Sequence, residues 1–211
     1  NWSYQVTNLK PGAFGQSSAR YFVKTRGPGD LDQEHMRSRE LGYNGYFPEA
    51  GLALDVKLFH DEITGMISEP LRNNQYIASN ANKERFSGAE TQLDWRVGRF
   101  DRLRLTYAFV DADASNPLDA RQTASNSGSA GWLRDWGKGW NSALFYYGDD
   151  ALNGYRFERV DARIAKRIAL GKASLELAGV LQQRLDNQPT TFVDNHYDQR
   201  HVMYFSAELE L

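Results

Sequence analysis

The strict alternation of apolar and polar side chains most constrains this chain, and it is clearest in GLALDVKLFH, residues 51–60. Aliphatic residues fill the even positions 52–58, whereas Asp55 and Lys57 stand at odd positions. Successive side chains of a strand point to opposite faces, so the pattern predicts a β-strand with one aliphatic and one charged face. A soluble sheet would bury the aliphatic face, whereas a membrane barrel would turn it to lipid and the charges to a wet lumen.

Composition narrows the class of protein. The 211 residues suffice for one domain over 1–211, and a net charge of −2 gives no reason to expect a nucleic-acid partner. No apolar run approaches the roughly 18 residues of a membrane-spanning helix. A negative mean hydropathy argues against a helical bundle but is compatible with a barrel, whose lumen and loops are polar. The absence of cysteine excludes a disulfide framework and a thiolate site.

The same alternation recurs along the chain, and no segment has a convincing helical pattern. About ten strands are expected, the first of them less well defined than the others. They are predicted at residues 1–9, 36–47, 52–60, 84–97, 102–110, 127–134, 140–147, 155–168, 173–182 and 201–211.

The gaps between these strands alternate between short turns and longer polar stretches. Short turns are expected at 48–51, 98–101, 135–139 and 169–172, and longer stretches at 69–83, 111–126, 148–154 and 183–199. This alternation is typical of outer-membrane barrels, and aromatic residues near the short turns suggest an interfacial girdle. The girdle residues would be Trp95, Phe100, Trp132, Trp136 and Trp140. We predict an all-β, antiparallel up-and-down transmembrane β-barrel, while a soluble β-sandwich or water-soluble barrel remains the alternative.

Several ordered motifs resemble the C-terminal part of the barrel of TonB-dependent outer-membrane receptors. They are Leu31, Glu34, Ser38 and the run Glu40–Tyr43, then Leu52–Phe59, then Gly88 with Glu90, and finally RVDARIAKRI and ASLELAGVLQQRLDN. The resemblance covers residues 31–211, and residues 1–30 match too poorly to be placed. The family has an N-terminal plug and about 22 strands, so the resemblance implies that this chain is a C-terminal portion without the plug. The chain ends in Leu211, whereas the family usually ends in an aromatic residue.

The resemblance implies energy-coupled uptake of a scarce ligand, such as a ferric siderophore, haem, cobalamin or a glycan, in the bacterial outer membrane. Expected partners are outer-membrane lipid, TonB through a plug region outside this chain, and a small-molecule ligand such as a metal chelate. No cofactor is expected. Loop arginines and tyrosines would suit an anionic, catecholate-rich chelate through charge and stacking, although each is also explained as a solvated loop residue. The candidates are Arg72, Tyr76, Arg121, Tyr155, Arg156, His196 and Tyr197.

Metal and enzyme sites are weakly indicated. His196 and His201 are five residues apart, which in an extended chain places them on opposite faces, so no metal pair is expected. No G-x-S-x-G motif is present, and we predict that the protein is not an enzyme. Acids at Asp111, Asp113, Asp149 and Asp150 fit ordinary loop positions better than calcium ligands. The alternatives are a complete small outer-membrane barrel, structural or hydrolytic with acids and His201 at its loop ends, and a soluble β-domain that binds a partner or glycan.

Overall fold

The computed structural model describes residues 24–26, 31–68, 71–72, 75–152, 155–186 and 200–210, and nearly all of these residues form strands. The strand predicted at 1–9 and the residues His196, Tyr197 and Leu211 lie outside this part of the chain. Nine strands form an antiparallel sheet in the order β12-β11-β10-β9-β8-β7-β6-β3-β2, and three short strands form a second sheet in the order β1-β5-β4. The nine are β2 (His35–Phe47), β3 (Leu52–Ser68), β6 (Ser79–Val97), β7 (Asp101–Ala114), β8 (Asn126–Gly137), β9 (Trp140–Leu152), β10 (Tyr155–Leu170), β11 (Ala173–Arg184) and β12 (His201–Glu210).

The chain divides into two compact units. The first unit contains the chain up to Ser38 together with Asp61–Arg85 and Asp113–Ala120. The second unit contains Arg39–His60, Phe86–Ala112 and Arg121–Leu211. The short strands β1 (Lys24–Arg26), β4 (Leu71–Arg72) and β5 (Gln75–Ile77) belong to the first unit, as does the four-residue helix α1 (Pro117–Ala120).

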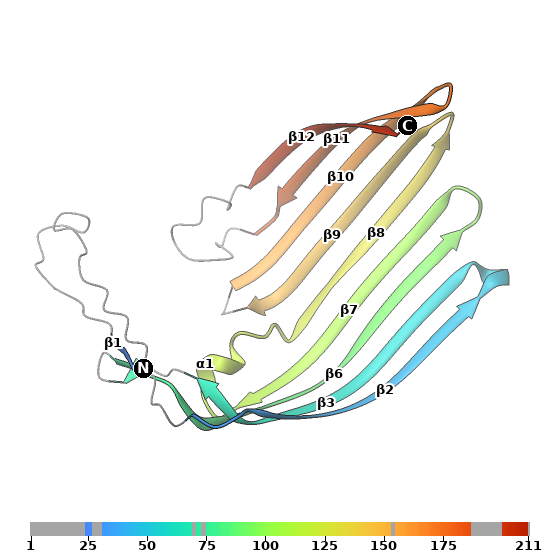
Figure 1. The fold of residues 1–211 in the computed structure, drawn as a ribbon. Helices are drawn as coiled ribbons and strands as arrows, with labels where there is room; N and C mark the ends of the chain where they lie inside the picture. The colour runs from blue at the N-terminus through green and yellow to red at the C-terminus, as the bar shows by residue number, and fades with distance from the viewer. Residues whose placement is uncertain are drawn as a thin grey trace, which may run out of the picture. The chain divides into compact units, whose positions relative to one another are not determined.

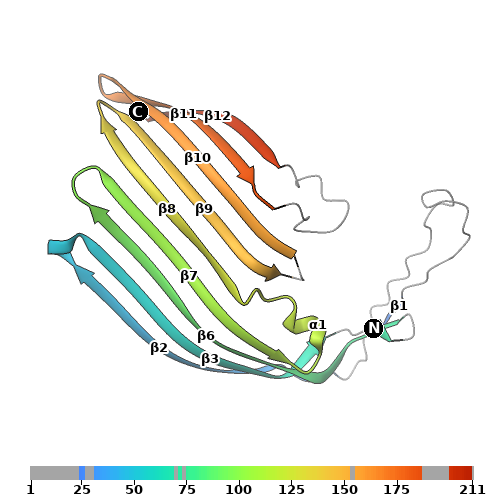
Figure 2. The same cartoon turned by 180° about the vertical axis from the view of Figure 1, so that it is seen from behind.

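Tight turns join the strands of the second unit at one end (Figures 1 and 2). The β2–β3 turn is a 3₁₀ helix, Pro48–Ala50, which ends at Gly51 with φ 63° and a hydrogen bond from Gly51 N to Pro48 O of 3.1 Å. Glycine also supplies positive φ in the later turns, at Gly98, Gly139 and Gly171. These are the short turns that the sequence predicted, and glycine serves them because it adopts this conformation without steric cost.

The longer polar stretches contain more strand than the sequence predicted. Residues 79–83 belong to β6, residues 111–114 to β7, and residues 148–152 to β9. The all-β prediction is confirmed, and the described residues contain only one short α-helix, the four-residue α1 within the stretch 111–126. The sequence reasoning looked for apolar alternation, but these strand ends are polar and are fixed by hydrogen bonds to neighbouring chain.

Polar contacts hold the first unit together. The side chain of Asn80 donates to the carbonyl oxygens of Asp32 and Gly65 at 2.9 and 2.6 Å, and accepts from Asp32 N at 2.7 Å. Farther along β3, β6 and β7, the strand positions that were apolar in the second unit carry charged residues, which form an ion-paired group. Arg85 lies 3.5 Å from Glu62 and 4.0 Å from Asp113. Such an ion-paired group is poorly suited to hydrocarbon, so these strand ends suit an aqueous environment.

The second unit has an uncovered apolar face in place of a conventional core. The buried hydrophobic residues of the described chain are all alanines, namely Ala78, Ala165 and Ala178. Meanwhile Met203 is 69% exposed and Phe205 82% exposed. A soluble sheet would cover such residues with a second layer, so this face is the one that meets lipid. The described residues contain no helix long and apolar enough to cross a membrane.

Candidate functional site

Strand register sorts the second unit into an apolar face and a polar face. Directly opposed residues in an antiparallel pair share a face. One row of opposed residues crosses six strands and is apolar throughout. It runs Leu103, Trp132, Leu144, Ala162, Leu181 and Met203.

The opposite face carries ion pairs between neighbouring strands. Asp94 on β6 accepts from Arg102 and Arg104 on β7, the latter at 3.1 Å. Lys57 on β3 lies 2.8 Å from Glu90 on β6. Each pair is partly exposed, so it contributes at most about 1 kcal/mol to stability. Their consequence for function is a face that holds both signs of charge and suits a water-filled lumen.

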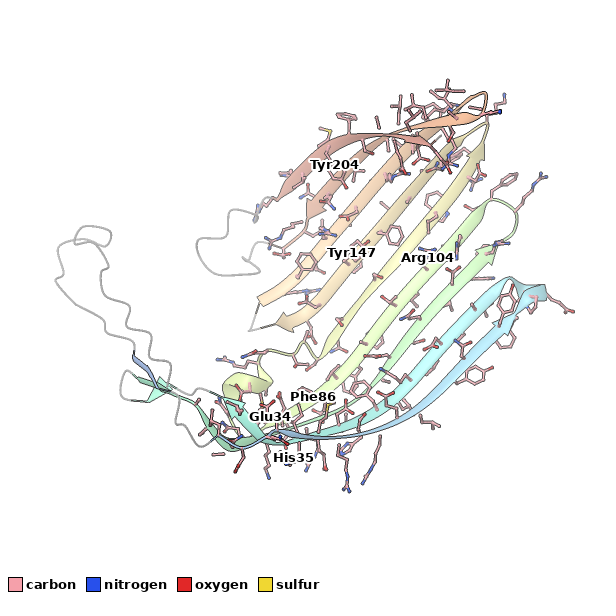
Figure 3. All side chains as sticks on the ribbon, in the orientation of Figure 1. Glu34, His35, Phe86, Arg104, Tyr147 and Tyr204 are labelled. Carbon is pink, nitrogen blue, oxygen red and sulfur yellow. The ribbon has the colours of Figure 1, made fainter. Side chains whose placement is uncertain are left out.

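An open hollow lies on the polar face over β2, β3, β6 and β7. Its volume is about 570 Å³. Asn44 donates to Asp55 within it at 2.9 Å, and Arg104, labelled in Figure 3, lines it from β7. The polar side chains that line it are Asn44, Asp55, Gln92, Asp94, Arg104 and Thr106. With two carboxylates and one arginine, this hollow presents both signs of charge.

An arginine–aromatic row crosses the polar face on β9, β10 and β11. It consists of Phe145, Tyr147, Phe157, Arg159 and Arg184. The rings of Phe145 and Tyr147 are stacked with centroids 5.9 Å apart, and Tyr147 is labelled in Figure 3. The guanidinium of Arg159 lies 5.0 Å from the Tyr147 ring and 5.8 Å from the Phe157 ring. Arg184 lies 6.0 Å from the same Phe157 ring.

Neighbouring residues fix the geometry of this row. The Phe145 ring lies over Gly131, its register partner on β8, where an added Cβ would approach the ring to 2.2 Å. Asp161 lies 2.8 Å from Arg159 Nε and also accepts from Gln182 at 2.9 Å. Arg184 pairs with Asp186. The row therefore presents stacked rings beside guanidinium groups whose positions are set by carboxylates, an arrangement that can stack on planar groups and attract anions.

Sequence reasoning missed this row because it searched the loops for ligand contacts. The alternation of residues along each strand already indicated part of the row. Phe145 and Tyr147 share one parity of FYY, and Phe157 and Arg159 share one parity of YRFER. Only the register, which opposes Tyr147 to Arg159 and Arg159 to Arg184, brings the two sets together.

The predicted loop residues fall in several places. Arg72 and Tyr76 lie on adjacent strands β4 and β5, so they are strand rather than loop residues. Tyr155 begins β10 and pairs with Leu152, and Arg156 beside it donates to Glu158 at 2.8 Å. Arg121 is exposed in the turn after α1. His196 and Tyr197 lie outside the described residues, and ligand binding by any of the seven stays a prediction.

Two of the four acids singled out in the sequence have ordinary polar partners. Asp150 accepts from Asn126 at 2.6 Å, and Asp113 lies near Arg85. Within the described part of the chain, no group of three or more His, Asp or Glu is placed to hold a metal ion. In the first unit, burial and the nearby Asp119 raise the pKa of Glu84, which is 7% exposed.

The antiparallel up-and-down sheet, with a lipid-facing apolar surface and a charged opposite face, defines the class of transmembrane β-barrels. Among the described residues its two edge strands are β2 and β12, and the sheet does not close on itself. The chain belongs to the TonB-dependent receptor family, because a model of the family described as "TonB dependent receptor-like, beta-barrel" matches residues 3–181. The resemblance is thereby confirmed, although the match begins before residue 31 and ends at residue 181. The family consists of transporters of the bacterial outer membrane, which is where this protein is located.

Two solved structures of OmpT from Vibrio cholerae are similar, one expressed in the outer membrane and one folded in vitro in trimer form. Each is 11% identical, and the TM-scores are 0.42 and 0.41. Each alignment covers 71% of this chain and 46% of the OmpT chain, so this chain spans less than half the length of the structures it matches. No curated protein matches the chain.

Proposed function

We propose that this protein takes part in TonB-dependent uptake of a scarce, anionic small molecule, with a ferric siderophore as the leading ligand class. Ligand would be captured on the loop side and would pass along the charged face of the sheet. The plug and the segment that contacts TonB would lie outside these 211 residues. Family membership supports this proposal for the whole protein.

The arginine–aromatic row is the observation that supports a ferric siderophore as the ligand class. Ferric catecholates combine negative charge with aromatic rings. Stacking on Phe145 and Tyr147 would contact such rings, while Arg159 would contribute positive charge. Because the row lies on the face opposite the lipid-facing band, it is available to a solute in the lumen.

Adjacent tyrosines provide a matched test. Tyr147 belongs to the arginine–aromatic row, whereas Tyr146 lies on the apolar face and donates to Glu158 at 2.8 Å. We would measure uptake of a radiolabelled ferric catecholate by cells that express the complete gene. The Tyr147→Ala variant should lose about two- to tenfold in apparent affinity, the stacking energy being about 0.5–1.5 kcal/mol. The Tyr146→Ala variant should retain uptake at equal surface abundance.

Two outcomes separate the ligand class from the transport mechanism. Uptake that survives deletion of TonB would contradict the TonB-dependent mechanism. If the wild-type protein transports haem, cobalamin or a glycan but no ferric catecholate, the siderophore assignment is wrong while the transport assignment stands. Equal affinities of the two tyrosine variants would remove the arginine–aromatic row from the ligand path.

A further inference from the structure

A second cluster, on the lipid-facing side, combines cations with tryptophans at the short-turn end. We call it the basic–aromatic rim and define it as Arg134, Trp136, Lys138, Trp140 and Lys166. Arg134 and Trp136 lie on β8, Trp140 on β9 and Lys166 on β10, while Lys138 lies in the β8–β9 turn. All five belong to the second unit.

Register shows that the rim belongs to the apolar face. Lys166 is opposed to Trp140 on one side and to Leu177 on the other. Two residues earlier on the same strand, Ile164 is opposed to Ser142 and is 56% exposed. Lys166 therefore emerges from the lipid-facing side of the sheet, where a lysine is tolerated only if its ammonium reaches the membrane interface.

Two cations of the rim cover two of its indole rings. The Arg134 guanidinium lies 4.6 Å from the Trp136 ring, and the Lys166 ammonium lies 5.1 Å from the Trp140 ring. Lys166 Nζ also donates to the backbone carbonyl of Lys138. Both cation–ring pairs lie at the short-turn end of neighbouring strands, and indoles in barrels are enriched at the level of the lipid headgroups.

The charge on this surface is not balanced. Arg134 is neutralised by Asp101, at 3.2 Å, and the Oδ1 atom of Asp135 accepts from the amide of Gly137. Lys166 forms no ion pair with the described residues, since its contacts are a ring and a carbonyl. Lys138 is exposed in the adjacent turn. The rim therefore keeps an excess of positive charge on a face that meets lipid.

One hydrogen-bond donor is also unused at this place. The indole N–H groups of Trp95, Trp132 and Trp136 donate to Ala50 O, Asp101 and Ser142 respectively. The indole N–H of Trp140 has no acceptor among the described residues, although the Lys166 ammonium lies over the Trp140 ring. An unused N–H beside an ammonium that has no carboxylate partner in the described part of the chain is suited to an anionic oxygen acceptor.

We propose that the basic–aromatic rim binds the phosphate of an anionic phospholipid headgroup in the leaflet on the short-turn side, with Lys166 and the Trp140 N–H as its main contacts. The lipid chains would lie along the apolar face below it, against Ile164 and Leu144. A lipid is favoured over free phosphate because the cations emerge from the lipid-facing side of the sheet. This inference needs the membrane orientation of the sheet but not the transported ligand.

Tryptophan quenching by brominated lipids tests the proposal. The complete protein would be reconstituted into phosphatidylcholine vesicles that contain a minor fraction of brominated phosphatidylglycerol, with the labels exchanged in a second set. Wild-type protein should be quenched by brominated phosphatidylglycerol beyond its mole fraction. Lys166→Gln should lower that preference about fivefold, as expected for one cation near an anionic surface.

A matched control removes a lysine elsewhere. Lys83 is exposed near the other end of β6, so Lys83→Gln changes the net charge equally and should leave the preference unchanged. Heat-modifiable gel migration would confirm that each variant is folded. Equal preference in wild type and Lys166→Gln would overturn the proposal. Loss of the preference on adding millimolar inorganic phosphate, at constant ionic strength, would reassign the rim to free phosphate and also overturn it.

Discussion

A lysine introduced at Leu105 should destabilise the protein far more than a lysine introduced at its neighbour Thr106. Leu105 is 43% exposed on the apolar face and is opposed to Ala130. It follows Phe100 of the girdle by five residues. At about 3.3 Å per residue and a tilt of about 45°, it lies about 12 Å along the membrane normal, near the middle of a band about 25 Å tall. Lysine there costs about 2–4 kcal/mol.

Thr106 lies on the polar face and lines the open hollow with Asp55 and Asp94. Lysine at this position gains nearby carboxylates and loses the 2.8 Å contact between the hydroxyls of Thr106 and Ser129, for a net cost of at most about 1 kcal/mol. Urea unfolding of the protein in lipid vesicles, followed by tryptophan fluorescence, measures both variants. With an m value of about 2 kcal/mol/M, Leu105→Lys should lower the midpoint by about 1–2 M. A larger loss for Thr106→Lys would show that the two faces are assigned the wrong way round.

Two further predictions concern single side chains. Gly131→Ala should destabilise the protein by about 1–3 kcal/mol in the same unfolding assay, because the new Cβ would meet the Phe145 ring. Gly42 has open space around it, so Gly42→Ala should change stability by at most about 0.5 kcal/mol, and equal effects of the two substitutions would contradict the packing of Phe145 on Gly131. Burial and the nearby Asp119 raise the pKa of Glu84 above 4.5 in the folded state, so the folded protein binds the Glu84 proton more tightly than the unfolded chain does. The contribution of Glu84 to stability is therefore greatest below the unfolded pKa and is lost as pH rises through the folded pKa. Glu84→Gln should therefore raise the thermal midpoint at pH 7 and bring no gain well below pH 4.5, and a gain that persisted unchanged at low pH would rule out titration as its cause.

Much of the strand pattern could be predicted from the sequence, because the side chains of a strand alternate between its two faces with a period of two residues. The run from Leu52 to Leu58 specified its own faces, and glycines at 51, 98, 139 and 171 specified turns. The polar ends of β6, β7 and β9 escaped prediction for a physical reason. Beyond the lipid band neither face needs to be apolar, so hydrogen bonds to a neighbouring strand maintain the extended chain without a hydropathy signal.

The sequence alone determined that alternate residues would divide into an aliphatic and a charged set, because backbone geometry fixes that alternation locally. Tertiary structure decided what each set would contact. Register opposed Tyr147 to Arg159 on the polar face and Lys166 to Trp140 on the other. The uncovered state of residues such as Phe205 decided that the aliphatic set faces lipid. Pairing between strands depends on hydrogen bonds between residues distant along the chain, and a one-residue slip would exchange the faces, so no local pattern could fix these contacts.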